Sequence, residues 1–218
     1  MRAQDSFESQ ADTRTYLVVH NAFRLATTRF ADATGKLEPS QLQHMIGSHW
    51  NFYAAVLHEH HHNEDDSIFP ALLVARPDLD ALIKRLEDDH RQLIGNMEAV
   101  DSAISAFEAQ PDAAHQETMH DAVVAVRDTF LPHLDIEDEE ILPAIAVSIE
   151  PKEWDRMDKA ALKAIPRQYL PTAAGAIDEV VQGMAKDEQP APPPLPIRLM
   201  LSLSWRKKYS IWVKPLLV

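Results

Sequence analysis

A histidine followed four residues later by a glutamate occurs twice in this chain, inside two segments that resemble one another. Residues 60–70 and 133–143 align at a single offset and share the histidine, the glutamate, acidic residues after it and a proline. The aligned pairs are His60 with His133, Glu64 with Glu137, Asp65 with Asp138 and Pro70 with Pro143. Because four residues advance about 400° around an α-helix, each imidazole stacks one turn from its carboxylate on one face. Each pair can therefore offer two ligands to one metal centre.

Two further histidines lie where an apolar residue is expected. His20 interrupts the stripe Tyr16, Phe23, Thr27 and Phe30, and His90 interrupts a long leucine-rich stripe. An unpaired histidine or glutamate in an apolar seam costs several kcal/mol, so the buried groups need a common solution. A metal centre supplies one, and its predicted ligands are His20, His60, Glu64, His90, His133 and Glu137.

The order of these six residues is twofold and suits two metal ions. We expect one ion on His20 and His60 and the other on His90 and His133, with the two glutamates bridging both. Imidazole and carboxylate without thiolate favour iron, with manganese or zinc as alternatives. The remaining positions are expected to hold a bridging oxo or hydroxo group and water, dioxygen or peroxide.

Other polar side chains near these ligands are expected to be less directly involved. Tyr16 and Tyr53 share a face with ligands and are candidates to donate a hydrogen bond to a bound oxygen species, although core packing is the alternative role. The neighbours of the first pair, His58, His61 and His62, are predicted to be solvated, with His61 and Asp65 as an alternative register. His49 lies about 16 Å from His60 by helical rise, too far to coordinate.

The elements that must position these residues are helices. The apolar spacing predicts helices over 13–33 and from about 46 to a break at Phe69 and Pro70. It predicts two more, one opening at 77–78 and one starting after 110–112 with a kink at Pro132. Further helices are expected over 153–164 and 172–185. The fold class is therefore all-α: an up-down-up-down four-helix bundle over 12–150, with a helical C-terminal extension over 151–218.

Composition excludes several classes of protein. The chain has 218 residues, no cysteine and a formal net charge of −13. Disulfides, iron–sulfur clusters and cysteine zinc sites are thus excluded. Residues 1–150 hold 10 Lys and Arg against 27 Asp and Glu, and such an acidic body makes nucleic acid an unexpected partner. The polar start of the chain, residues 1–8, and the lack of a long apolar run predict a cytoplasmic protein.

The end of the chain differs in charge from the rest. Residues 151–218 hold 11 Lys and Arg against 7 Asp and Glu, and the last 22 residues, 197–218, are basic and aromatic with no acid. A proline-rich stretch at 190–196 predicts a stiff, extended linker. The tail is expected either to pack on the bundle or to associate peripherally with an anionic membrane or with another chain.

The order of His20, the His60 and Glu64 pair, His90, and the His133 and Glu137 pair resembles the hemerythrin-like (HHE cation-binding) family over residues 12–150. That resemblance implies a four-helix bundle with a non-haem di-iron centre, and activities that include oxygen binding, peroxide breakdown and iron or redox sensing. Oxygen carriers of the family have a further histidine where this chain has Ile94. With two histidines per iron, both irons are expected to be open, which ranks reactivity with dioxygen or peroxide above storage and leaves catalase-like turnover undecided.

Three other interpretations stay open at this point. An iron or redox sensor would expose a partner surface when it loses its metal. A ferritin-like oxidase needs Glu-x-x-His motifs, which the pairs Glu59 with His62, Glu87 with His90 and Glu117 with His120 satisfy in spacing only. A metal-free scaffold would tolerate loss of His60 or Glu64 without a change in stability.

Overall fold

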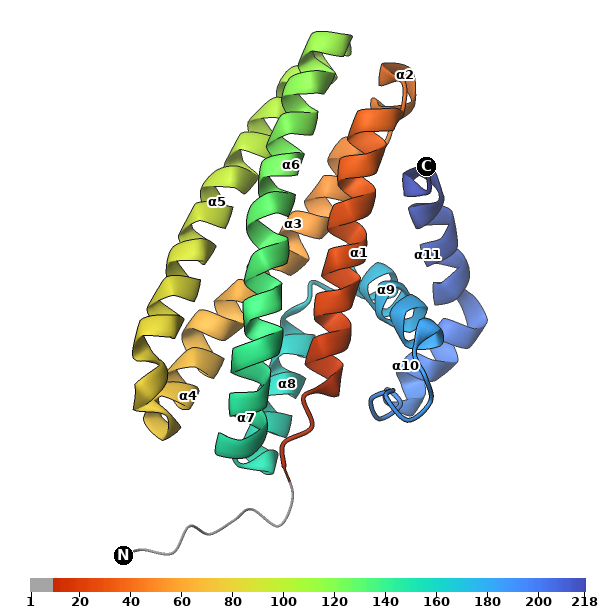
Figure 1. Cartoon of the computed structure of the whole chain (residues 1–218). Coiled ribbons are helices and arrows are strands. Elements are labelled where there is room, and N and C mark those ends of the chain that lie inside the picture. Colours follow the sequence, from red (N-terminus) through yellow and green to blue (C-terminus); the bar gives the residue numbers. More distant parts are fainter. Residues whose placement is uncertain (1–9) are drawn as a thin grey trace, which may run out of the picture.

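Residues 10–218 are described by a computed structural model, and they form helices and connecting segments with no strand among them (Figure 1). Four long helices lie lengthwise beside one another: α1 (Arg14–Lys36), α3 (Ile46–Asn63), α5 (Asp80–Ala109) and α6 (Ala113–Ile136). A short helix, α2 (Pro39–Leu42), lies between α1 and α3. The prediction of an all-α protein is confirmed.

The prolines predicted that the helices would end at the two His and Glu segments, but in the structure the chain stays helical through both. After α3 the chain continues as a π-helix over Glu64–Ile68 and then as α4 (Phe69–Ala75). After α6 it continues in the same way through a π-helix over Glu137–Ile141 into α7 (Leu142–Ser148). Pro132 lies inside α6 without ending it.

The wider π-helical turn explains why the chain stays helical. The amide of Phe69 donates to the carbonyl of Glu64, and the amide of Leu142 donates to that of Glu137, each five residues back. The proline that follows lacks an N–H, and the extra residue in the turn relieves the clash that a proline makes with a regular α-helix. Single π-helical turns inside α-helices frequently occur at functional sites, and the two turns within the bundle each begin at a glutamate of the repeat.

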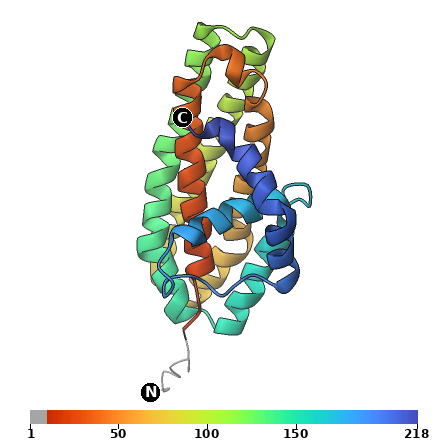
Figure 2. The same ribbon diagram turned by 90° about the vertical axis from the view of Figure 1, so that its right-hand side faces the viewer.

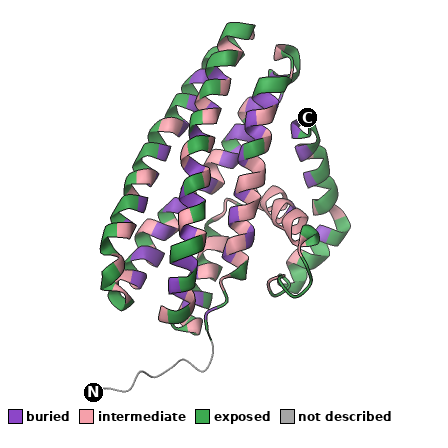
Figure 3. Cartoon of the chain, viewed as in Figure 1, coloured by how far each residue is buried: buried purple, intermediate pink, exposed green. Residues whose placement is uncertain are grey.

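The histidines His20, His60, His90 and His133 lie at the same height along the bundle axis. Apolar side chains fill the bundle interior above and below them. One buried cluster includes Phe23, Tyr53, Leu57, Leu93 and Phe130, and the other includes Tyr16, Ile68, Phe69, Leu86 and Ile141. In each long helix, the predicted ligands fall between residues of these two clusters, and the buried positions face the neighbouring helices (Figure 3). The polar level is therefore sealed along the bundle in both directions.

The C-terminal extension is helical and folds back on the bundle. It consists of α8 (Pro151–Ala164), α9 (Leu170–Gly183), α10 (Leu195–Met200), a π-helix over Leu201–Trp205, α11 (Arg206–Val213) and a final 3₁₀ turn over Lys214–Leu216. Figure 2 shows α9 crossing in front of α1, and α11 packs against α9 on the outer side of the molecule. Helix α10 begins inside the predicted linker, with Pro196 in its first turn, where proline is tolerated.

Polar contacts of Arg29 and His49 help to hold this extension against the bundle. Arg29 of α1 pairs with Glu179 of α9 at 2.7 Å, and the Tyr209 hydroxyl donates to the same carboxylate. His49 of α3 stacks on Trp212, with ring centroids 4.4 Å apart, and its Nε2 lies 2.7 Å from the Trp212 carbonyl oxygen. The tail thus packs on its own bundle, while membrane or self-association through residues 197–218 stays a prediction.

Among the residues described, none of the helices combines the length and apolar character needed to cross a membrane. The polar segment at 1–8, on which the prediction of a cytoplasmic protein partly rested, lies outside the described residues.

Candidate metal centre

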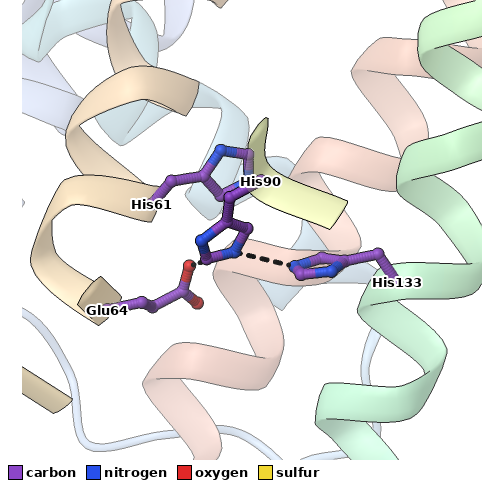
Figure 4. Close-up of side chains that lie close together, drawn as sticks. All are labelled: His61, Glu64, His90 and His133. Atoms are coloured by element: carbon purple, nitrogen blue, oxygen red, sulfur yellow. Dashed lines mark hydrogen bonds and ion pairs between the residues drawn. The ribbon is translucent and has the colours of Figure 1, made fainter. Parts of the chain in front are cut away.

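The six predicted ligands lie together inside the bundle and are joined by His61. Ligand atoms of His20, His60, Glu64 and Glu137 all lie within 4.8 Å of one another, and we name these four residues the first group. Ligand atoms of His61, Glu64, His90 and His133 satisfy the same limit and form the second group (Figure 4). All seven residues are buried, with exposed fractions of 0 to 9%. Glu64 belongs to both groups.

Each glutamate presents one oxygen to each group. Glu64 Oε1 lies 3.2 Å from His60 Nε2, and its Oε2 lies 3.5 Å from His90 Nε2. Glu137 Oε2 lies 3.6 Å from His20 Nε2, and its Oε1 lies 3.4 Å from His133 Nε2. A carboxylate placed in this way can bind two cations at once, one through each oxygen. The π-helical turns that begin at these glutamates direct both side chains inward.

Most of the inward-facing atoms lack a partner, although they are fully buried. Among the described residues, the buried atoms without a hydrogen-bond partner are His20 Nε2, His60 Nε2, His61 Nε2, Glu64 Oε2, His133 Nδ1, Glu137 Oε1 and Glu137 Oε2. Leaving such groups unsatisfied costs about 1–3 kcal/mol each, and more when they are charged. Bound cations would satisfy the imidazole and carboxylate donors together, so the residues present fit a two-metal centre.

Burial shifts the protonation equilibria of these groups toward their neutral forms. It raises the pKa of Glu64 well above its ordinary value, and the neighbouring Glu137 carboxylate raises it further. It also raises the pKa of Glu137 to about 7. Burial lowers the pKa of His60, His61 and His133 below the ordinary range, which leaves neutral imidazoles ready to coordinate. A metal-free centre therefore disfavours the carboxylate charge that a cation would require.

A second pair of carboxylates orients the histidines from behind. His20 Nδ1 lies 2.6 Å from Asp138 Oδ1, and His90 Nδ1 lies 2.8 Å from Asp65 Oδ1. Arg24 in turn pairs with Asp138 at 2.7 Å. An aspartate on Nδ1 fixes the tautomer in which Nε2 is free to bind a metal. The sequence interpretation named Asp65 only in the alternative register with His61 and assigned no role to Asp138, although the aligned repeat placed Asp65 on Asp138 directly after the glutamates.

The comparison with known families gives one match, to the hemerythrin HHE cation-binding domain over residues 12–145. That match covers more than half of the chain. The chain belongs to the hemerythrin HHE cation-binding family. Comparisons with curated proteins and with solved structures give no match. Membership implies a bound cation, and the buried histidines and glutamates of this HHE domain are arranged to hold it.

His61 was predicted to be solvated, and the structure corrects this. Its ring is 5% exposed and stacks on His90, with centroids 4.2 Å apart and planes at 20°. His60, by contrast, faces His20, with centroids 5.2 Å apart. Because α3 packs between α1 and α5, consecutive residues on it can face different neighbours. The second group of this HHE domain therefore has three histidines, while the first group has two.

The two tyrosines have different positions. The Tyr16 hydroxyl donates a very short hydrogen bond to Glu64 Oε1, and burial raises the pKa of this phenol well above its ordinary value. The hydroxyl of Tyr53 instead lies 2.6 Å from Thr27 Oγ1, and Tyr53 precedes His60 by about two turns of α3. Tyr16 thus bonds to a predicted ligand, and its hydrogen bond to a bound oxygen species stays a prediction, whereas Tyr53 packs in the core.

The remaining histidines lie apart from both groups. His62 is exposed and faces Asp66 at 3.3 Å, which is the surface pairing expected of it. His49 is buried and bonds to backbone carbonyls of Met45 and Trp212. Of the Glu-x-x-His pairs that suggested a ferritin-like oxidase, only His90 contributes to either group.

Proposed function

We propose that this HHE protein binds two iron ions, one at each group, and that the bound iron reacts with dioxygen or peroxide. The observation that carries the proposal is the pair of histidine groups joined by Glu64 and Glu137, whose buried oxygens each face one group. Nitrogen and oxygen donors without thiolate suit iron, with manganese and zinc as competitors. Iron held there would supply a redox couple and vacant coordination positions.

The numbers of imidazoles differ between the two positions. The second group offers three imidazoles and the first offers two, while Glu64 and Glu137 each turn one oxygen toward each group. Because Ile94 stands where oxygen carriers have a histidine, both irons were expected to be open. The position of His61 changes this proposal, since His61 can supply the second group with a third imidazole from another helix. We infer that the first group leaves more room for an exogenous ligand, which favours binding of dioxygen or peroxide on that side.

The chain's own residues prepare the whole centre in three ways. Asp138 and Asp65 hold the imidazoles of His20 and His90 in the coordinating tautomer. The Tyr16 hydroxyl donates to Glu64 Oε1, the oxygen that faces the first group, and so restrains that carboxylate. The two apolar clusters exclude bulk water along the bundle. The scaffold that achieves this is, we infer, an up-down-up-down bundle, because connections such as that between α5 and α6 are only a few residues long.

Metal analysis of the purified protein tests this function directly. We expect two irons per chain with near-ultraviolet absorption, and a loss of iron when His61 is changed to alanine. His62→Ala is the matched control, since His62 is exposed beside it. Addition of peroxide should then release oxygen with many turnovers. Stoichiometric bleaching without turnover would reject the enzymatic reading, and a chain that takes up no transition metal would reject the whole proposal.

A second candidate function, iron or redox sensing, is favoured by one contact between the centre and the extension. The Trp154 ring of α8 packs edge-on against Tyr16, with centroids 5.6 Å apart, and its indole donates to the Asp12 carbonyl. Loss of the cation would loosen Glu64 and Tyr16, and the extension with them. Limited proteolysis at 186–197 with and without iron tests this, and an unchanged cleavage pattern would count against it.

A further inference from the structure

A cavity of about 110 Å³ lies between the bundle and the C-terminal extension. Helices α1 and α3 form one side of it, through residues such as Val19, Phe23 and Phe52. Helices α8 and α9 form the other, through residues such as Leu162 and Ile177. Two of the four helices that line it, α8 and α9, therefore come from the segment that follows the family match at 12–145.

One end of this cavity reaches the first group. Tyr16 and His60 both line it, while His61, His90 and His133 do not. His60 also has the largest exposed fraction of the seven buried ligand candidates, at 9%, compared with 5% for His61 and 0 to 2% for the others. The cavity thus leads to the group that has fewer histidines.

The lining limits the chemistry of an occupant. Its surface is almost entirely aliphatic and aromatic, and its few polar side chains include the carboxylates Glu59 and Asp158. No lysine or arginine is among the lining residues in the described chain, so nothing there neutralises an anion. An anion would meet both low polarity and like charge, whereas an uncharged apolar molecule would meet neither obstacle.

The size of the cavity suits a small organic molecule. An engineered cavity of about 150 Å³ with an aliphatic lining stays dry and takes up benzene. A volume of about 110 Å³ accommodates a short alkyl chain or one aromatic ring. It is larger than the volume that a diatomic gas molecule occupies. Clefts of this kind usually bind ligands through apolar contact, with a few polar groups that fix orientation.

We propose that the cavity is a binding site for a small uncharged organic molecule, whose apolar part lies between α3 and α8 and whose polar end faces Tyr16 and His60. The proposal rests on the proposed function in one respect, since it places this molecule beside the more open metal position. It assigns a role to the extension: α8 and α9 cover the surface of α1 and α3 and so form a cavity that admits only small uncharged molecules to the first group. The molecule would be a substrate, or would control access to the centre.

Binding of benzyl alcohol and of benzoate tests this proposal, because the two probes share a ring and differ in charge. Ligand-detected NMR and calorimetry on the full-length, metal-free protein should show saturable binding of benzyl alcohol, and at least tenfold weaker binding of benzoate. Ala161→Leu places a larger side chain into the cavity from α8 and should weaken benzyl alcohol at least tenfold. Ala160→Leu is the matched control, since Ala160 is exposed on the same helix, and it should change affinity less than twofold.

Several results would overturn the proposal: no saturable binding of benzyl alcohol, equal binding of benzoate, or an Ala161→Leu variant that binds as well as the wild type. If Ala161→Leu does not fold, Leu162→Ala decides, since it enlarges the cavity and should shift preference toward a two-ring alcohol. An unchanged preference would then refute the site. Iron uptake is measured separately, so a chain that takes up no iron but binds the alcohol refutes the proposed function alone, and a chain that takes up iron but does not bind the alcohol refutes the cavity alone.

Discussion

The substitution Glu137→Gln should have opposite effects on stability with and without metal. Glu137 is 1% exposed, and burial raises its pKa from the ordinary value of 4.5 to about 7. The folded, metal-free protein therefore holds this proton more tightly than the unfolded chain does. The stability that the group contributes is complete below pH 4.5 and is lost as the pH rises through about 7.

The size of the loss follows from the two pKa values. Since one pH unit is worth about 1.4 kcal/mol, the difference between 4.5 and about 7 corresponds to about 3 kcal/mol. Glutamine has nearly the shape of the protonated glutamate and cannot ionise. The metal-free Glu137→Gln variant should thus match the wild type near pH 4 and exceed it by up to about 3 kcal/mol at pH 8. With metal bound, the same variant lacks an anionic ligand that faces both groups, and it should be less stable than the wild type.

Urea unfolding followed by circular dichroism, at pH 4 and pH 8, with chelator or with iron, measures all four differences. Glu140→Gln is the control, because Glu140 lies exposed in the same π-helical segment and should change stability by no more than about 0.5 kcal/mol. The reasoning fails if Glu137→Gln destabilises the metal-free protein at pH 8. Such a result would mean that contacts within the protein already satisfy the carboxylate, so that it does not await a cation.

Three other predictions concern the surroundings of the centre. Asp138→Asn should lower iron affinity about 10- to 100-fold in competition with a chelator, because it replaces the anionic acceptor that orients His20 with a neutral amide; an affinity equal to that of Glu139→Gln would contradict this. Gly175→Ala should destabilise the extension by about 1–3 kcal/mol, since an added Cβ would overlap the side chain of Tyr209, while Gly183→Ala should not, because nothing lies within 4 Å; thermal unfolding and protease sensitivity report both, and equal effects would refute the packing described. The tail at 197–218 should bring the protein down with anionic vesicles but not with neutral ones, because it holds five basic residues, no acid and exposed leucines; equal sedimentation with both would exclude electrostatic docking.

The helical class and the six buried ligand candidates could be predicted because they follow one rule. In a bundle, inward positions recur with the helical period, so an ionisable residue in an apolar stripe indicates a buried site. His20 and His90 satisfy this rule as single residues, and the structure buries both. Whether each coordinates a metal stays a prediction that metal analysis must test.

His61 could not be found by the same rule, because periodicity assumes one inward direction for each helix. Helix α3 has two relevant neighbours, so His60 faces α1 and His61 faces α5. The helix ends were also mispredicted for a physical reason. A proline ends a regular α-helix, but the π-helical turns before Pro70 and Pro143 relieve its clash, and nothing in the local apolar spacing reveals a π-helical turn.

The twofold repeat of the sequence supplies a nearly symmetric scaffold, and its exceptions give the centre two unequal sides. The residue after His60 is His61, whereas the residue after His133 is Leu134, so only the second group gains a third imidazole. One turn before His20 is Tyr16, which bonds to Glu64, whereas one turn before His90 is the apolar Leu86. Among the seven ligand candidates, only His60 lines the cavity of the extension, together with the neighbouring Tyr16. All three exceptions favour the first group as the reactive side of the proposed two-metal centre, because this group has fewer imidazoles, a hydroxyl beside its carboxylate and a cavity next to it.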